Sequence, residues 1–239
     1  MGCGLMAFAW DTEHPIMTGS PFTWVNSPVD VADLHNADAT KTLVPATGHR
    51  ASSTDKTIAV GDTHFTIGCY VWVDATPGDT QHFLTTINNS PGTDNYLYIN
   101  VQPDGRVGCT YQGNALFKQS QSAIGDMSYA EWLHYIFSIN MATGDINIYK
   151  NGVEATYSTD NAGTLTGVSM ADRAIGVGSQ YINTFAQGLS GSVSRLKISS
   201  GTTTGSIITS AEAATEYAAE LALLGDAYNP QVLLTTLFS

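Results

Sequence analysis

The feature that most constrains this chain is a series of short alternating segments, each bounded by a turn sequence. From His64 onward the run FTIGCYVWVDA alternates with period two and is rich in β-branched and aromatic residues, which predicts a strand with one buried face. Turn sequences recur at short intervals, including TPGD, NNSPGTDN, PDG, TGD, KNG and DNAG. Between them lie HFLTTI, YLYINV, RVGCTY, WLHYIFSIN, INIYK, VEATYS, AIGVGSQ and SVSRLKIS. The spacing predicts an all-β, antiparallel sandwich of two sheets.

The clearest local signal is the segment INIYKNGVEATY. Asn151 and Gly152 separate two alternating runs and can adopt the positive φ angles of a type I′ turn, so we expect a β-hairpin there. Its apolar residues, Ile146, Ile148 and Val153, are expected to point inward or toward a neighbouring sheet.

One helix is expected near the end of the chain. Thr209 and Glu212 have capping-box spacing before AEAATEYAAELALL, and Gly225 is placed to end the helix. The apolar stripe would contain Tyr217, Leu221 and Leu224. The carboxylates Glu212, Glu216 and Glu220 are expected to face water, with a metal site as the alternative.

Composition excludes several partners. The formal charge is −12, from 9 Lys and Arg against 21 Asp and Glu, and such a chain repels phosphate backbones, so we expect no nucleic-acid binding. No apolar run is long enough to span a bilayer.

Cys3, Cys69 and Cys109 are odd in number and lack metal-ligand spacing, so buried free thiols are favoured over a disulfide.

We divide the chain into three parts. Residues 1–55 are predicted to form an extended N-terminal arm with lead-in strands, residues 56–225 a sandwich domain with a closing helix, and residues 226–239 an apolar C-terminal tail that docks on its own domain or on a partner. The first residues have no basic region and too short an apolar stretch for a secretory signal, so synthesis in the cytoplasm is expected.

The stretch from about 65 to 220 resembles the laminin G-like and pentraxin-like branch of the concanavalin A-like lectin/glucanase superfamily. The resemblance is carried by FTIGCYVWVDA, by EWLHYIFSIN followed by GDINIYKNGV, by AIGVGSQ with FAQGLSGSVSRLKI, and by SAEAATEYAA. It implies a jelly-roll sandwich with one short C-terminal helix. It also implies that Trp72 and Trp132 are buried and that His134 makes a structural hydrogen bond. Because this fold hosts lectins, hydrolases, adhesion modules and virion proteins, it does not by itself define an activity.

No catalytic residues are expected. The superfamily's glucan hydrolases carry a Glu-x-Asp-x-x-Glu strand, so that acid and nucleophile flank the scissile bond, and no such run occurs here. No serine lies in a nucleophile elbow, and the histidines lack zinc-site spacing. The sequence therefore predicts a protein that is not an enzyme.

Two kinds of binding site remain open. The resemblance implies that calcium could bind at a loop rim, although no cofactor is required and turn formation is the alternative role for each donor. The candidate calcium ligands are Asp74, Asp79, Asp94, Asn95, Asp104, Asp160 and Asp172. Carbohydrate binding would use exposed aromatic rings near polar loops. The candidates for that role are Tyr96, Tyr98, Tyr111, Phe117 and Tyr181.

Three functional hypotheses follow. The first is a structural component of a viral or phage virion, such as a capsid decoration or tail protein, with other virion proteins or a homo-oligomer as partner. The second is a carbohydrate-binding lectin or adhesin, with or without calcium, that is extracellular or at a cell surface and touches glycans there. The third is a glycoside hydrolase or lyase. We favour the first, on the irregular arm, the apolar tail and the lack of an export signal.

Overall fold

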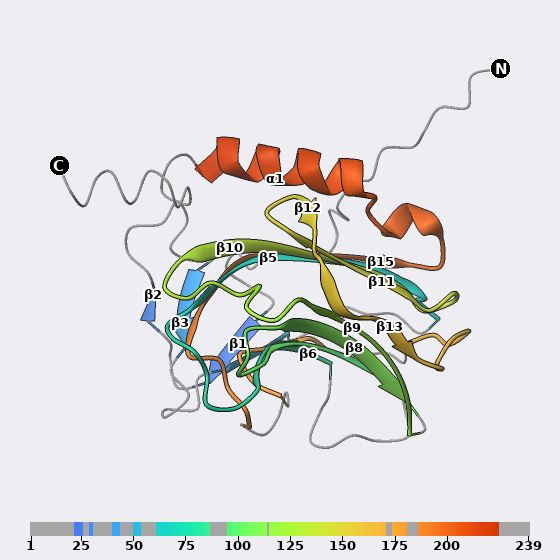
Figure 1. Cartoon of the computed structure of the whole chain (residues 1–239), viewed down its shortest axis with the longest axis horizontal. Coiled ribbons are helices and arrows are strands. Elements are labelled where there is room, and N and C mark those ends of the chain that lie inside the picture. Colours follow the sequence, from blue (N-terminus) through green and yellow to red (C-terminus); the bar gives the residue numbers. More distant parts are fainter. Residues whose placement is uncertain are drawn as a thin grey trace.

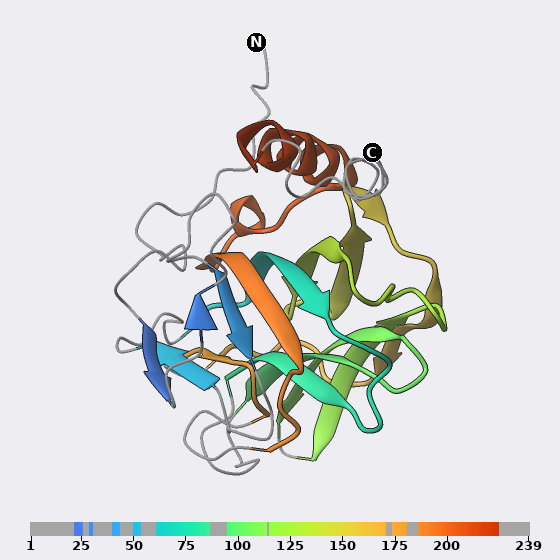
Figure 2. The ribbon, with the colours of Figure 1, turned by 90° about the vertical axis from the view of Figure 1, so that its left-hand side faces the viewer.

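Two antiparallel β-sheets lie face to face in the computed structural model, which describes residues 22–25, 29–30, 40–43, 50–53, 61–86, 95–113, 115–170, 174–180 and 186–224. Figure 1 shows three layers. Helix α1 (Ser210–Leu224) lies above the seven-stranded sheet, and the eight-stranded sheet lies below the seven-stranded one. The same layering is visible from the side in Figure 2. The predicted jelly-roll sandwich with one C-terminal helix is confirmed.

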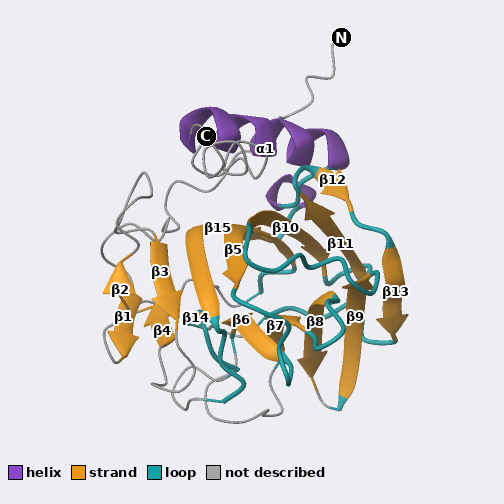
Figure 3. Ribbon diagram, turned by 60° about the vertical axis from the view of Figure 1, so that its left-hand side comes forward, coloured by secondary structure: helices purple, strands orange, loops and turns teal. Residues whose placement is uncertain are grey.

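Figure 3 shows the strands of the two sheets as two rows. In the described part of the chain, the eight-stranded sheet has the order β1 (Phe22–Val25), β4 (Arg50–Ser53), β14 (Gly176–Val177), β6 (Gln81–Thr85), β7 (Tyr96–Val101), β8 (Val107–Gly113), β9 (Leu116–Ser122) and β13 (Tyr157–Gly163). The seven-stranded sheet has the order β12 (Val153–Glu154), β11 (Asp145–Lys150), β10 (Trp132–Asn140), β5 (His64–Val73), β15 (Gly191–Gly201), β3 (Thr40–Leu43) and β2 (Val29–Asp30). A short 3₁₀-helix, η3 (Thr204–Ser206), precedes α1.

The main core fills the space between the two sheets. Alternate residues of each central strand point inward, as the period of two requires. In β5 these include Cys69 and Val71, and in β8 they include Cys109. Both cysteines are free and buried, as the sequence predicted for them, and burial raises the pKa of the Cys69 thiol to about 12. Cys3 lies outside the described residues.

The predicted hairpin is present. Asn151 and Gly152 have φ angles of 50° and 77°, which are the left-handed values of a type I′ turn. Ile146 and Ile148 are buried, but Val153 is exposed, because β12 is the last strand of its sheet. VEATYS was expected to be one strand, and this was wrong. The chain leaves the seven-stranded sheet after β12 and enters the other sheet as β13.

Helix α1 packs on the outer face of the seven-stranded sheet. Its N-terminus has the predicted capping box, in which the Thr209 amide donates to the Glu212 carboxylate at 2.9 Å. A second, small core of Ile136, Tyr149, Ile208 and Ala213 lies under the helix.

The expectation that the helix carboxylates face water was wrong for Glu216 and Glu220. Lys197 donates to Glu216 at 2.6 Å, and Arg195 binds the Glu220 carboxylate through two nitrogens. Both cations lie on β15, so the charged face of the helix meets the sheet. Periodicity showed that these glutamates share a face, but it could not show that two cations lie opposite them.

Trp72 and Trp132 lie on this same outer face of the sheet and not between the sheets. They are paired across β5 and β10, with ring centroids 5.9 Å apart. Trp132 is buried and Trp72 is half-buried, and the Trp72 indole donates to Asp74 at 3.1 Å. His134, also on this face, makes a structural contact through its backbone amide, which donates to Asn151 Oδ1 at 2.9 Å.

Before residue 55 the structure describes the strands β1 to β4, and each pairs within the two sheets of this chain. Residues 226–239, which were predicted to form an apolar tail, lie outside the described residues, as does Gly225. Among the described residues, no helix is long and apolar enough to cross a membrane.

Candidate functional site

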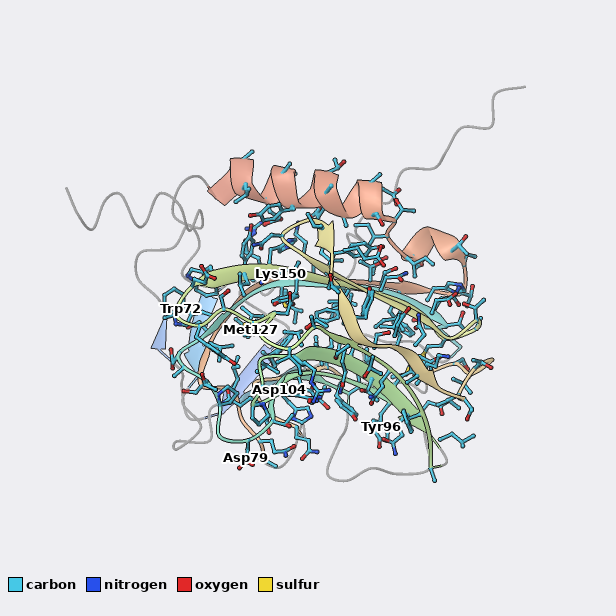
Figure 4. All side chains as sticks on the ribbon, viewed as in Figure 1. Trp72, Asp79, Tyr96, Asp104, Met127 and Lys150 are labelled. Atoms are coloured by element: carbon cyan, nitrogen blue, oxygen red, sulfur yellow. The ribbon has the colours of Figure 1, made fainter. Side chains whose placement is uncertain are left out.

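A row of aromatic and amide side chains covers the outer face of the eight-stranded sheet. On β7 the alternate residues Tyr96, Tyr98 and Asn100 point outward, because the intervening residues Leu97 and Ile99 are in the core. The register places Gln112 of β8 opposite Tyr96. Figure 1 shows that this sheet bends so that its outer face is the concave one, and Figure 4 shows Tyr96 on that side, away from α1.

These side chains line a cavity of about 340 Å³. Its described wall comes from β6, β7 and β8, from the residue before β6, and from the segment between β14 and β15. The described lining residues are Thr80, His82, Tyr96, Tyr98, Asn100, Gln112, Gln180 and Gln187. None of these lining residues is an aspartate, glutamate, lysine or arginine, so the described part of the wall is polar but uncharged.

The rings in the cavity hold one another in place. Tyr96 and Tyr98 are stacked with centroids 6.3 Å apart, and the His82 ring meets Tyr98 edge-on at 5.3 Å. Burial raises the pKa of Tyr98, and its hydrogen bond with the Thr110 hydroxyl opposes part of that rise. The Tyr98 hydroxyl is therefore neutral at physiological pH. Such preformed rings cover the apolar face of a ligand at little cost in side-chain entropy.

Two polar atoms in the wall lack partners. His82 Nδ1 and Asn100 Oδ1 are buried and have no hydrogen-bond partner in the described part of the chain. Burial lowers the pKa of His82 to about 4, and a hydrogen bond between the ring and the Gln187 backbone opposes part of that shift. The ring is therefore neutral at physiological pH.

The absence of a side chain at Gly108 leaves room for the Asn100 amide. Gly108 lies opposite Asn100 in the register, and a Cβ atom there would come within 2.9 Å of Asn100 Oδ1. That distance is too short for an oxygen and a carbon in contact. The amide of Asn100 can take its observed place only because β8 has no side chain at this point.

The structure brings two of the predicted aromatic residues together. Tyr96 and Tyr98 both line the cavity, and Phe117 of β9, opposite Gln112 in the register, lies on the same sheet face with 41% of its surface exposed. Tyr111 points the other way. It is fully buried between the sheets, where its hydroxyl donates to the Leu165 carbonyl at 2.8 Å. Tyr181 lies outside the described residues.

Sequence reasoning missed the rest of the wall, namely Thr80, His82, Asn100, Gln112, Gln180 and Gln187. Asn100 could have been found, because it continues the alternation of Tyr96 and Tyr98 along β7. Gln180 and Gln187 lie in irregular segments, and no local pattern in the sequence marks them.

The candidate calcium ligands that the structure describes form no common cluster. Asp74 accepts from Trp72 and Ser190, Asp104 pairs with Arg106 at 2.8 Å, Asp160 accepts from Asn161, and Asp79 is exposed. Asn95 donates to the Ser169 carbonyl instead. No group of three or more His, Cys, Asp or Glu side chains suited to a metal occurs among the residues that the structure describes. Asp94 and Asp172 lie outside those residues.

Fold and site together define a β-sandwich whose concave sheet carries a cavity lined, in its described part, by aromatic and uncharged polar residues. A family profile described as the concanavalin A-like lectin/glucanases superfamily, of laminin G type, matches residues 46–209, which is more than half of the chain. The protein therefore belongs to this superfamily, as the resemblance indicated. A comparison with curated protein sequences gives no significant match.

Solved structures confirm the fold. A heptameric SAP-like pentraxin from Limulus polyphemus is 15% identical with a TM-score of 0.53, covering 82% of this chain and 80% of the pentraxin. The binding domain of botulinum neurotoxin serotype D is 8% identical with a TM-score of 0.58, covering 84% of this chain but 46% of that one. A Ruminococcus gnavus sialidase module, CBM40, bound to α2,3-sialyllactose, is 12% identical with a TM-score of 0.51, covering 88% of this chain and all of the module.

Proposed function

We propose that this protein is a non-catalytic carbohydrate-binding module whose site is the cavity on the concave sheet. The observation that carries the proposal is the combination in one cavity of two stacked tyrosine rings with uncharged hydrogen-bonding groups. Sugars present both apolar C–H faces and hydroxyl groups, and this wall matches both.

The fold neighbours support a binding role. The Ruminococcus gnavus module of similar fold is bound to a trisaccharide, and the botulinum domain is a binding domain. The lining residues support binding over hydrolysis, since none of those described is a carboxylic acid, and glycoside hydrolysis requires a pair of carboxyl groups about 5 to 10 Å apart across the scissile bond.

The test is a glycan array with the purified protein and two variants. Tyr98→Ala removes one of the stacked rings and is expected to weaken binding about tenfold, which corresponds to about 1.4 kcal/mol, because the variant loses the apolar ring face. Val153→Ala, an exposed residue on the edge of the other sheet, is the matched control and should bind like the parent. Binding of all three proteins to the same degree would place the site elsewhere, and release of cleaved sugar would make the protein an enzyme.

A second proposal concerns the assembly to which such a module would belong. The sequence favours a component of a viral particle, because the apolar segment YNPQVLLTTLFS follows the sandwich domain. Such a segment is typical of chains that are tied down by neighbours in an assembly. In that setting the protein would be located in the virion, with itself or other virion proteins as partners. This role is compatible with glycan binding.

A further inference from the structure

An exposed aromatic ring, that of Phe117, lies on the same sheet face as the cavity. Gln112 of β8, which lines the cavity, is opposite Tyr96 on one side and opposite Phe117 on the other. Residues directly opposite in an antiparallel pair have their side chains on one face, with Cβ atoms about 4.5–5.5 Å apart. The three side chains therefore form a row that leads from the cavity across β8 to β9.

The alternation of β9 gives the same orientation. The Ser120 hydroxyl donates to the Ile146 carbonyl of the other sheet at 3.0 Å, so Ser120 points into the sandwich. Phe117 and Gln119 are an odd number of positions away and point outward. Among the large hydrophobic side chains exposed in the described part of the chain, Phe117 is the one aromatic residue, with 41% of its surface exposed.

The next row of the sheet continues this surface with uncharged groups. Thr110 is opposite Tyr98 on β7 and opposite Gln119 on β9. Gln119 is half-buried and keeps part of its surface for a ligand. One row further along the strands the arrangement changes, because Gln121 accepts a hydrogen bond from Arg106 at 2.8 Å. The cavity is therefore continued across the strands toward Phe117.

This continuation is longer than one sugar ring. Tyr96 and Phe117 lie on strands that are two positions apart in the sheet, which corresponds to roughly 10 Å. Figure 1 shows that β8 and β9 continue the concave surface on which Figure 4 places Tyr96. The cavity itself, with about 340 Å³, is at the small end of the range for ligand pockets and suits one sugar unit.

We propose that the protein binds an oligosaccharide chain, with one unit in the cavity and a further unit on the ring of Phe117. This inference rests on the proposed carbohydrate-binding function, and it adds a second subsite and a minimum ligand length. Covering the exposed part of the Phe117 ring with the apolar face of a sugar removes apolar surface from water on both partners. Phe117 thus discriminates between ligands by their length.

The test measures affinity against chain length by isothermal titration calorimetry on the full chain. The probes are malto-, cello-, xylo- and arabino-oligosaccharides, each from the monosaccharide to the hexasaccharide. In at least one series, affinity is expected to rise about fivefold between the shortest ligand that binds and the length that reaches Phe117, and then to level off. Equal affinity at all lengths would overturn the inference and leave the carbohydrate-binding function standing. Binding at no length would overturn both.

Two variants assign the gain to the ring. Phe117→Ala should lose the fivefold gain and keep the affinity for the shortest ligand, whereas Phe117→Trp, which keeps an aromatic surface, should retain the gain. Leu116→Ala is the matched control, because Leu116 is 49% exposed but lies opposite Gly113 and so on the other side of β9. Circular dichroism shows that each variant is folded. A gain that persists in Phe117→Ala would refute the second subsite.

Discussion

The charge state of His134 follows from its burial. It lies between β10 and α1, where its ring is stacked on Tyr217 with centroids 5.7 Å apart and tilted against Tyr70 at 4.7 Å. Burial lowers its pKa to about 3, Glu220 opposes that shift, and Lys197 and Arg195 add to it. The ring is neutral at physiological pH and acts as a flat aromatic group that helps to hold the helix.

This environment makes stability fall in acid. Below about pH 6.5 the unfolded chain binds a proton at His134 that the folded protein does not accept until about pH 3, so the free energy of unfolding decreases as the pH falls through that window. The slope from one such group is about 1.4 kcal/mol per pH unit. The pKa values of His82 and His64 are also lowered, and these residues act in the same direction.

We expect urea unfolding at a series of pH values between 7.5 and 4.5 to show this loss. In His134→Gln the slope of stability against pH should be smaller by about 1.4 kcal/mol per unit, whatever the variant's stability at neutral pH. A variant with the parent slope would show that His134 has the same pKa in the folded and unfolded states.

At the scale of elements, a bulge in β15 decides how α1 docks. The register with β5 shifts between Ser194 and Lys197, and Arg195 has a φ of 51°, in the left-handed region. Arg195 and Lys197 meet the carboxylate of Glu220, which is 3% exposed. Burial alone would raise the pKa of Glu220, but the hydrogen bonds from Arg195 and Lys197 outweigh it and lower the pKa. The helix is therefore attached through charge as well as through its small apolar core.

Removing that charge should loosen the helix. Glu220→Gln leaves Arg195 and Lys197 partly buried without their shared carboxylate, and we expect a loss of about 3 kcal/mol in the free energy of unfolding. Asp79→Asn, which removes one exposed carboxylate, is the control and should change stability by less than about 0.5 kcal/mol. Chemical denaturation followed by circular dichroism measures both. Equal effects of the two substitutions would mean that the ion pairs contribute nothing to docking.

The turn of the β11–β12 hairpin also contacts this helix. A Cβ at Gly152 would come within 3.0 Å of the Tyr217 Cβ and 3.1 Å of the Ala214 Cα. Glycine at this position thus satisfies two requirements at once, since it takes the positive φ of the turn and allows the helix to approach closely. The sequence predicted only the first.

At the scale of the whole molecule, the sandwich presents two different outer faces. Helix α1 packs on the outer face of one sheet, and the outer face of the other sheet carries the cavity. A virion component would be recovered in a large assembly, because the apolar segment 226–239 would be buried against neighbours.

Light scattering on native material from its natural source is expected to give a mass many times that of the 25.4 kDa chain. Recombinant chain with residues 226–239 replaced by a Gly/Ser-rich segment of the same length is the comparison, and it should lose self-association if this segment makes the contacts. A native monomer that binds a defined glycan would remove the virion proposal and leave a free lectin.

Much of the fold was accessible from local patterns. Alternation located β5, β7, β8 and β10, and turn and capping chemistry located the hairpin and the start of α1. These depend on residues a few positions apart, which the sequence displays directly. β9 was missed, because Ser120 and Ser122 occupy inward positions and Gln119 and Gln121 occupy outward ones, so no hydrophobic alternation marks it.

The sequence by itself thus determined which segments are strands and where the chain turns, since backbone propensity and side-chain period act locally. Only the tertiary structure decided which face of each strand is covered. Tyr98 and Tyr111 look alike in sequence, yet one lines a cavity and the other is in the core, because both faces of a sandwich strand can carry aromatic residues. The partners of Glu220 and the meeting of His82 with Asn100 likewise depend on residues that are distant in sequence and adjacent only after the sheets have formed.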